Sequence, residues 1–531
     1  MSLWLYSYSS QCSLWALCDL GLRVSGFGSI KTTISTCSTC EYCPPQPLDF
    51  KINKVILFEK GVILRKIRVW IPVILILIGI GVIFFVKGGF SGKKEVFTED
   101  FFKKGANTEY LGVYLQGHKV GYLASRIDTV ENGYNVYSTT YLKLAPVPGM
   151  EKEVSYRVAA NTDLTYNLKS FEFSMSSDDY FFEAEGERKN GKLVVDMNVA
   201  GEKKHAEYDI ESSYIPATIE GLVKTGKTGE FQFFDPTLQS MFDIKVKDLG
   251  EDELDGEPVR KYSVLQSGME MVFWISEKGE LLRSESPIGL VMKKEERVMK
   301  EDIQTVGFKL YDSYAIRVDR EIENPRGISM LKIRLDSVDL SGLRIEDDRQ
   351  KLEGNVLTIK TVEPGQTSEI PKVVQEFLQA TAFIPSDDEK IVKIAKEVTG
   401  NSEGLGAVEK IINYVDEKLT DKPTFSIPNA LDALKSGEGD CNEHSALAVA
   451  LLRAVGIPSR VEVGLVYVNG AFYYHAWVGV YLGGKWISTD PTFGQLIADP
   501  THVKLEYGGF ENQAKLYRVI NKLQISVLDY D

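Results

Sequence analysis

The chain has 531 residues, too many for one domain, and its 44% hydrophobic and 11% aromatic content excludes a largely disordered protein. Its net charge of −14 is uneven, because residues 1–94 carry 11 Lys/Arg and 4 Asp/Glu, which leaves −21 on residues 95–531. Such an acidic body argues against nucleic acid as a partner.

Residues 1–50 differ in composition from the rest of the chain. They hold five of the six cysteines, and Cys37, Cys40 and Cys43 form a C-x2-C-x2-C run that could ligate a metal. Such a site needs a fourth ligand and a supporting fold, and neither is evident. We leave this segment unclassified; an alternative is that it is mistranslated upstream sequence.

A transmembrane helix is predicted at residues 69–86. These 18 residues carry no charge, which is close to the minimum length for a helix that crosses a bilayer. The preceding segment, 51–68, is rich in Lys and Arg, whereas few basic residues follow. The positive-inside rule then predicts a single-pass, uncleaved anchor with its N-terminus in the cytoplasm and residues 95–531 outside.

Residues 95–310 are predicted to form a β-rich domain. Turn signals such as Asn132-Gly133 and Asn190-Gly191 separate runs of alternating apolar and polar residues. We expect a large curved antiparallel sheet, interrupted by a short helical insertion within 213–241. The clearest predicted strands cover 134–144, 152–159, 170–175, 192–199 and 270–275. Residues 311–370 are predicted to form a second, smaller β domain.

From residue 371 to 531 a further domain of helices and strands is predicted. Ser386 and Glu389 form a predicted capping box for a helix that ends at Gly400. A second helix is expected near 405–419, because its apolar residues recur at helical spacing.

The only cysteine after residue 49 stands at the predicted start of a third helix. Asp440 is a good N-cap and Glu443 its capping-box partner, so Cys441 takes the first helical position. The positive end of the helix dipole there favours thiolate over thiol, and the free N–H groups can receive an oxyanion. His444, one turn further on, is interpreted as a structural residue behind the site.

Three strands are predicted after this helix, at 460–468, 471–482 and 485–489, with turns at Asn469-Gly470 and Gly483-Gly484. In this register His475 lies opposite Gly464, which leaves room for the approaching sulfur. Asp490 points to the same face as His475, roughly 7 Å away at the backbone. The carboxylate could then accept a hydrogen bond from Nδ1–H of the imidazole.

Cys441, His475 and Asp490 are therefore the candidate nucleophile, base and orienting carboxylate. The thiol attacks an acyl carbon, the imidazole moves its proton to the leaving amine, and the carboxylate holds the ring tautomer. Trp477 and Trp486 are predicted to wall this site. The alternative is that the cysteine is an inert buried residue and the histidine a structural one.

Residues 376–506 resemble the transglutaminase-like superfamily of papain-type thiol enzymes. The resemblance rests on GEGDCNEHSALAVALLRAVGIPSRVEVG and YYHAWVGVYLGGKWISTDPTFGQ. The family's catalytic triad falls on Cys441, His475 and Asp490. The resemblance implies an α+β fold with the cysteine-bearing helix on an antiparallel sheet, and acyl transfer through a thioester without a cofactor or metal. Members include cross-linkers, peptidases, amidases and inactive relatives, so hydrolysis and amine transfer both stay open.

Together these patterns predict one N-terminal transmembrane helix, large all-β domains and a papain-like transglutaminase core. The expected activity is that of a membrane-anchored, extracytoplasmic thiol enzyme acting on amide bonds of protein or peptide substrates. An alternative is a catalytically inactive binding or envelope-assembly module that uses its β domain.

Overall fold

The computed structural model describes residues 101–531 apart from short gaps. These gaps are 103–107, 148–149, 178–179, 200–201, 211–212, 216–217, 238, 267–268, 299, 304–313, 366–368, 423–427 and 521. The predictions for residues 1–50, 51–68 and 69–86 lie outside the described residues. Among the residues that are described, no helix is both long enough and apolar enough to cross a membrane.

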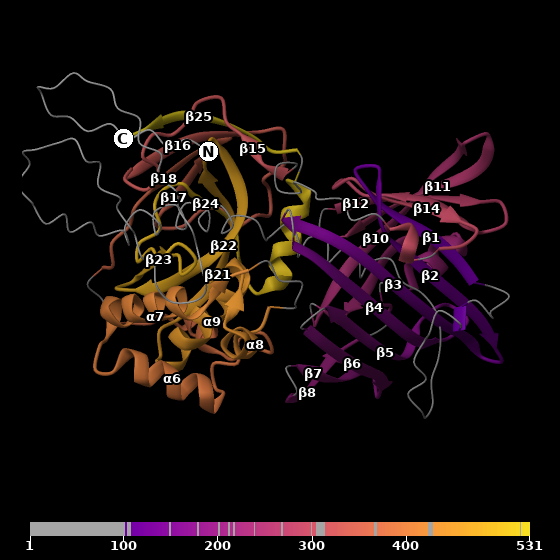
Figure 1. The fold of residues 1–531 in the computed structure, drawn as a ribbon, viewed down its shortest axis with the longest axis horizontal. Coiled ribbons are helices and arrows are strands. Elements are labelled where there is room, and N and C mark those ends of the chain that lie inside the picture. Colours follow the sequence, from indigo (N-terminus) through magenta and orange to yellow (C-terminus); the bar gives the residue numbers. More distant parts are fainter. Residues whose placement is uncertain are drawn as a thin grey trace, which may run out of the picture. The chain divides into compact units, whose positions relative to one another are not determined.

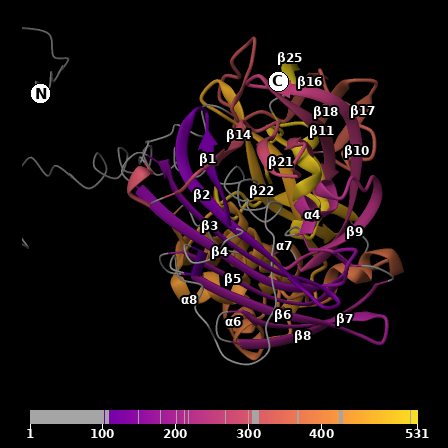
Figure 2. The ribbon, with the colours of Figure 1, turned by 90° about the vertical axis from the view of Figure 1, so that its right-hand side faces the viewer.

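The described residues between 108 and 295 form one antiparallel sheet of 14 strands (Figures 1 and 2). Its strands lie in the order β8-β7-β6-β5-β4-β3-β2-β1-β14-β13-β12-β11-β10-β9. Their bounds are β1 Thr108–Leu115, β2 His118–Val130, β3 Gly133–Val147, β4 Met150–Thr162, β5 Leu168–Ser177, β6 Tyr180–Lys189, β7 Lys192–Val199, β8 Glu202–Asp209, β9 Gly229–Asp235, β10 Ser240–Leu254, β11 Glu257–Gln266, β12 Met269–Ser276, β13 Leu281–Glu285 and β14 Leu290–Glu295. Each strand predicted in this region falls within one of them, because buried positions alternate with more exposed ones along strands such as β5.

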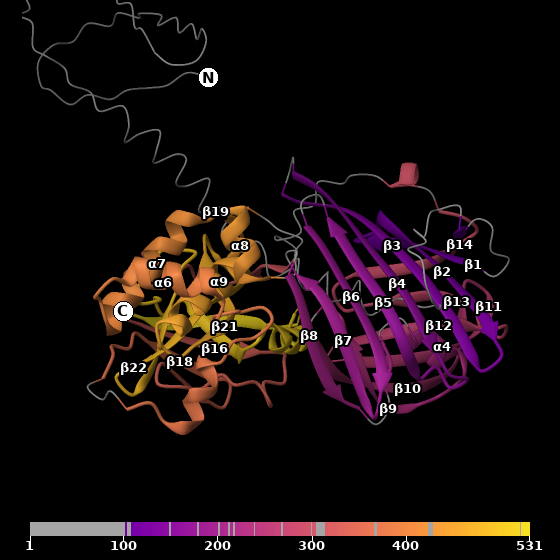
Figure 3. The ribbon, with the colours of Figure 1, turned by 90° about the horizontal axis from the view of Figure 1, so that it is seen from below.

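The two edge strands of this sheet approach each other, as expected of a strongly curved sheet (Figure 3). The rings of Tyr208 on β8 and Phe234 on β9 have centroids 4.9 Å apart. Phe234 also lies 5.7 Å from Phe171 on β5. The short helix α4, Ile219–Lys224, falls in the predicted interruption at 213–241, although the same stretch also contains β9.

A second sheet combines segments that are distant in the sequence. Its strands, in the order β17-β18-β16-β25, are β16 Met330–Asp336, β17 Gln350–Glu353, β18 Val356–Lys360 and β25 Gln524–Tyr530. β25 pairs with β16, so the region predicted as a small β domain, 311–370, shares this sheet with the end of the chain. Local sequence pattern does not reveal pairing over such a separation.

The helices of the C-terminal region gather on one side of strands β21 and β22 (Figures 1 and 3). They are α6 Glu389–Thr399, α7 Gly404–Lys418, α8 Ala430–Ser436 and α9 Cys441–Ala454. The predicted apolar face of α7 is buried. The predicted cap of α6 was wrong: Asp388, directly before the first helical residue, accepts a hydrogen bond from the Lys390 N–H, and Ser386 lies outside the helix. Shorter elements are η2 Lys300–Asp302, η3 Lys372–Leu378, β19 Thr420–Asp421, β20 Glu438–Gly439 and η4 Phe510–Arg518.

A third sheet carries three of the residues predicted to be functional, His475, Trp477 and Trp486. Its strands are β15 Ile316–Arg317, β21 Ser459–Val468, β22 Ala471–Leu482, β23 Lys485–Thr489 and β24 His502–Gly508. The predicted register is confirmed, with Gly464 opposite His475 and Leu482 opposite Lys485. The reason for Gly464 differs from the expected one: a Cβ there would lie 2.0 Å from the Val503 carbonyl oxygen, so the glycine admits the backbone of β24.

Candidate active site

Cys441 is the first residue of α9, and a capping box holds the start of this helix as predicted. The Asp440 carboxylate accepts a hydrogen bond from the Asn442 N–H at 2.6 Å. The Glu443 carboxylate accepts one from the Asp440 N–H at 3.0 Å. Burial and the neighbouring Glu443 raise the pKa of Asp440 well above its ordinary value. The thiol of Cys441 is fully buried.

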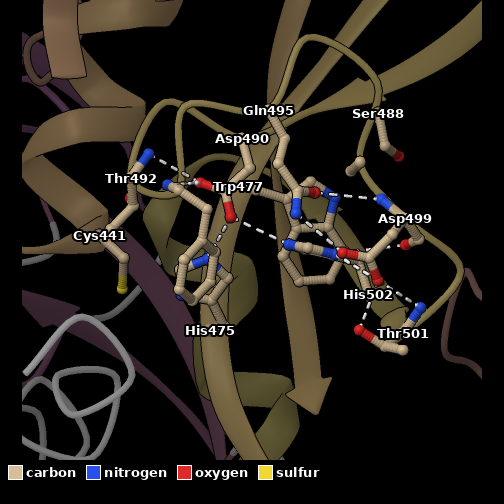
Figure 4. Close-up of polar contacts among 12 residues, drawn as sticks. Cys441, His475, Trp477, Ser488, Asp490, Thr492, Gln495, Asp499, Thr501 and His502 are labelled. Carbon is tan, nitrogen blue, oxygen red and sulfur yellow. Dashed lines mark hydrogen bonds and ion pairs between the residues drawn. The ribbon is translucent and has the colours of Figure 1, made fainter. Parts of the chain in front are cut away.

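The sulfur of Cys441 contacts β22 where that strand has a free edge. β21 lies along one side of β22, while β15 and β23 pair with the other side only at 471–472 and 478–482. In the described part of the chain, residues 473–477 therefore have no strand partner on that second side. The backbone N–H of Ala476 lies in this gap, near enough to the sulfur to lower the thiol pKa against the larger effect of burial. Figure 4 shows the Cys441 side chain beside the His475 ring.

His475 reaches Asp490 through Nε2, with 2.8 Å between Nε2 and Oδ2, and not through Nδ1 as predicted. The prediction assumed that Asp490 extends the strand, but β23 ends at Thr489. Asp490 instead begins a turn, in which its Oδ1 accepts hydrogen bonds from the N–H groups of Thr492 at 2.7 Å and Phe493 at 3.2 Å. This turn brings the carboxylate to the far nitrogen of the ring. Within the described residues, Nδ1 of His475 has no hydrogen-bond partner.

The charge states of the three residues follow from their burial. Burial raises the pKa of the Cys441 thiol well above its ordinary value, which is opposite to the preference for thiolate expected from the helix dipole. Burial also lowers the pKa of His475, against the opposing effect of Asp490. Burial alone would raise the pKa of Asp490, but its contacts with His475 and His502 hold that pKa well below the usual range. The resting site therefore pairs a neutral thiol with a neutral imidazole held by a carboxylate.

His502 on β24 belongs to the site and was not predicted. Its Nε2 lies 2.9 Å from Oδ2 of Asp490, the oxygen that also contacts His475 (Figure 4). The three side chains offer potential ligand atoms within 4.8 Å of one another. Hydrogen bonds from two ring nitrogens to one carboxylate account for this cluster without an ion. The sequence feature that could have indicated His502 is the scarcity of histidine, of which the chain has five.

Trp477 supports the His475 ring, whereas Trp486 does not wall the site as predicted. The Trp477 ring stacks on His475 at 5.9 Å between centroids. Trp486 packs against Tyr481 at 5.4 Å and lies under the guanidinium of Arg460 at 3.8 Å. Tyr481 is six residues beyond His475 on an extended strand, or roughly 20 Å away. Trp486 pairs with Tyr481 and so lies too far along the sheet from His475 to wall the site.

His444 and Asn442 lie on the first turn of α9. Nδ1 of His444 is 2.6 Å from the carbonyl oxygen of Asp440, so this histidine is tied to the start of the helix. Asn442 was not predicted; its Nδ2 lies 3.9 Å from the Cys441 sulfur. Its Oδ1 accepts a hydrogen bond from Nε2 of Gln513 at 2.9 Å, which orients the amide nitrogen toward the sulfur.

Comparison with known proteins finds a family match over the same region. Residues 392–491 match the transglutaminase-like superfamily. The chain is 29% identical over 157 residues to the uncharacterized protein ML0607 of Mycobacterium leprae, covering 27% of this chain and 54% of that protein. The chain thus spans about half the length of this curated relative.

Two solved structures show weaker likeness. A candidate cysteine protease from Cytophaga hutchinsonii is 18% identical, with 38% of this chain and 86% of that chain covered and a TM-score of 0.26. A β-barrel-like protein of a domain of unknown function, DUF1849, from Brucella abortus is 12% identical, with 36% and 95% covered and a TM-score of 0.28.

Proposed function

Because residues 392–491 form a transglutaminase-like domain, we propose that the protein is a thiol acyl-transfer enzyme that acts on amide bonds of protein or peptide substrates. One observation carries the proposal. The sulfur of Cys441 lies close enough to the backbone N–H of Ala476, the residue after His475, for that N–H to lower the thiol pKa. Nδ1 of the His475 ring has no hydrogen-bond partner among the described residues. A nucleophile, a base and an orienting carboxylate are thus brought together from three separate elements.

The proposed first half of the reaction forms a thioester. Nδ1 of His475 takes the proton of the Cys441 thiol while the sulfur attacks the carbonyl carbon of the amide. The Asp440 cap already accepts a hydrogen bond from the N–H of Asn442, so the N–H of Cys441 itself is the first-turn donor that stabilises the oxyanion. When the tetrahedral intermediate collapses, the C–N bond breaks and Nδ1 delivers its proton to the leaving amine. Asp490 stabilises the imidazolium throughout.

The second half transfers the acyl group from sulfur to an acceptor. Water or an amine attacks the thioester, His475 accepts the acceptor's proton, and that proton returns to the sulfur as the C–S bond breaks. Cys441 and His475 are both buried. A site that excludes water favours an amine over hydrolysis.

Incubation of the protein with a glutamine-containing peptide and a labelled primary amine tests this proposal. Label in the peptide together with ammonia release indicates amine transfer, whereas ammonia without label indicates hydrolysis. Cys441→Ala should abolish both. Equal turnover by this variant would reject the thiol mechanism.

We also propose that residues 69–86 anchor the protein so that the catalytic domain lies outside the cytoplasm. The support is the uncharged 18-residue segment with its basic N-terminal flank. Retention of the full chain in the membrane after alkaline carbonate extraction is expected. Protease added outside intact cells should cleave residues 95–531, and full protection there would contradict the orientation.

A further inference from the structure

Two histidines share one oxygen of the catalytic carboxylate. Oδ2 of Asp490 lies 2.8 Å from Nε2 of His475 and 2.9 Å from Nε2 of His502 (Figure 4). The other oxygen, Oδ1, accepts hydrogen bonds from the backbone N–H groups of Thr492 and Phe493. The carboxylate is therefore held on both oxygens and cannot move toward one histidine without leaving the other.

His502 lies between two carboxylates, whereas among the described residues His475 contacts a single carboxylate, that of Asp490. Nδ1 of His502 is 3.6 Å from Oδ1 of Asp499 and 3.3 Å from the Asp499 carbonyl oxygen. Asp499 is itself held by Arg326, 2.9 Å from its Oδ2. Both imidazoles are fully buried, so water screens these charges weakly. A proton that enters this cluster is thus stabilised more by its surroundings at His502 than at His475.

The remaining neighbours of His502 do not reverse this asymmetry. The ring of His475 lies 5.8 Å away between centroids. Trp477 and Phe493 contact the His502 ring as uncharged aromatic groups. The charged groups around His502 are Asp490, Asp499, Arg326 and Arg349. Arg349 donates a hydrogen bond to the backbone carbonyl oxygen of His502 at 2.6 Å. The two carboxylates contact the ring itself, while the arginines contact Asp499 and the backbone.

We propose that His502 is a positioning residue, which carries a positive charge between Asp490 and Asp499 and thereby keeps His475 neutral and able to act as the base. This proposal rests on the proposed thiol mechanism. The pKa directions agree with it. Burial would lower the pKa of His502, but Asp499 and Asp490 outweigh burial and raise it. Burial lowers the pKa of His475, and the charge of His502 lowers it further.

The proposal predicts what loss of the second histidine does. In His502→Asn the positive charge that opposes protonation of His475 is gone, while Asp490 remains beside the ring. His475 then binds a proton more readily, and its titration midpoint should rise by about one pH unit, a typical size for a local charge effect. The midpoint pH of the acidic limb of the pH–rate profile should move upward by a similar amount, because protonated His475 cannot accept the thiol proton.

Histidine-selective isotope labelling of the full chain and NMR titration test these expectations, since only five histidines contribute signals. In the wild type, His502 should be protonated at pH values where His475 is neutral with its hydrogen on Nε2. In His502→Asn the His475 midpoint should move upward. His205→Asn is the matched control: His205 also contacts a carboxylate, Asp196 at 2.8 Å, but at an exposed position on the 14-stranded sheet. This control should leave the His475 midpoint unchanged.

Two results would overturn the proposal. One is a wild-type titration in which His475 takes up a proton before His502. The other is an unchanged His475 midpoint in folded His502→Asn. If that variant does not fold, Asp499→Asn takes its place. In Asp499→Asn the titration midpoint of His502 should fall and that of His475 should rise. Unchanged midpoints would also reject the proposal. The thiol mechanism is judged separately, by whether Cys441→Ala and His475→Ala lose turnover.

Discussion

Nε2 of His475 lies 2.8 Å from Oδ2 of Asp490, and this contact determines which ring nitrogen would be the base in the proposed mechanism. Because the ionised carboxylate accepts a hydrogen bond from Nε2–H, the neutral ring keeps its lone pair on Nδ1. Cys441 contacts the backbone N–H of the next residue, Ala476, on the same strand. Substitution of a residue that holds this tautomer should therefore lower kcat strongly and change KM little.

Replacement of Asp490 by asparagine should reduce kcat by about 10³–10⁴-fold with little change in KM. An amide can donate its N–H to Nε2, which moves the ring hydrogen to Nδ1 and blocks the base, as in serine-type triads. Steady-state assays with a glutamine peptide measure the effect. Asp196→Asn serves as the control, because Asp196 makes the same type of contact to the exposed His205. Retention of more than a tenth of the activity in Asp490→Asn would contradict the tautomer role.

The resting thiol of Cys441 should react with iodoacetamide only at high pH. Its pKa is raised by burial, so the thiolate fraction stays small near neutrality and the rate should still be rising at about pH 9. Unfolding in guanidinium should restore a midpoint of about 8.5. Peptide-resolved mass spectrometry is needed because five other cysteines lie in residues 1–50. A plateau of the folded-state rate below about pH 7 would mean that the site rests as a thiolate–imidazolium pair.

Glu462 should be important for stability, because one buried carboxylate joins three strands. It accepts hydrogen bonds from Arg460 at 2.8 Å, from Nε1 of Trp477 at 3.0 Å and from Ser488 at 2.6 Å. Glu462→Ala leaves the buried Arg460 without this partner and should cost about 3–5 kcal/mol. Ser488→Ala removes one hydrogen bond and should cost about 1 kcal/mol. Calorimetry of the full chain compares the two variants, and equal melting temperatures would contradict this role.

Gly464→Ala should destabilise the active-site sheet. The new Cβ would lie 2.0 Å from the Val503 carbonyl oxygen, so β21 and β24 must separate, at a cost of about 1–3 kcal/mol. Because β24 carries His502, activity should fall as well. Gly406→Ala in α7 is the control, since its Cβ would meet only the Ser402 Cβ at 3.9 Å and should stabilise the helix by up to about 1 kcal/mol. Similar melting temperatures for the two variants would show that β24 adjusts without cost.

Features set by near neighbours in the chain were predictable. The capping box at Asp440 and Glu443 joins residues three positions apart, and the Asn469-Gly470 turn sets the register that places His475 opposite Gly464. The large curved antiparallel sheet was predictable for the same reason, since most of its strands pair with their neighbours in sequence. Its pairing of β1 with β14, and the pairing of β25 with β16 in the second sheet, join distant segments, which no local pattern encodes.

The sequence by itself determined which residues are the candidates for nucleophile, base and carboxylate, because helix caps, hairpin turns and strand alternation are short-range properties. Only the tertiary structure decided how they act. The end of β23 at Thr489 turned Asp490 toward Nε2, and β24 brought His502 to the same oxygen. Burial then raised the pKa of Cys441 against the helix dipole. Each of these depends on atoms from segments far apart in the chain, whose positions and dielectric surroundings exist only once the domain is folded.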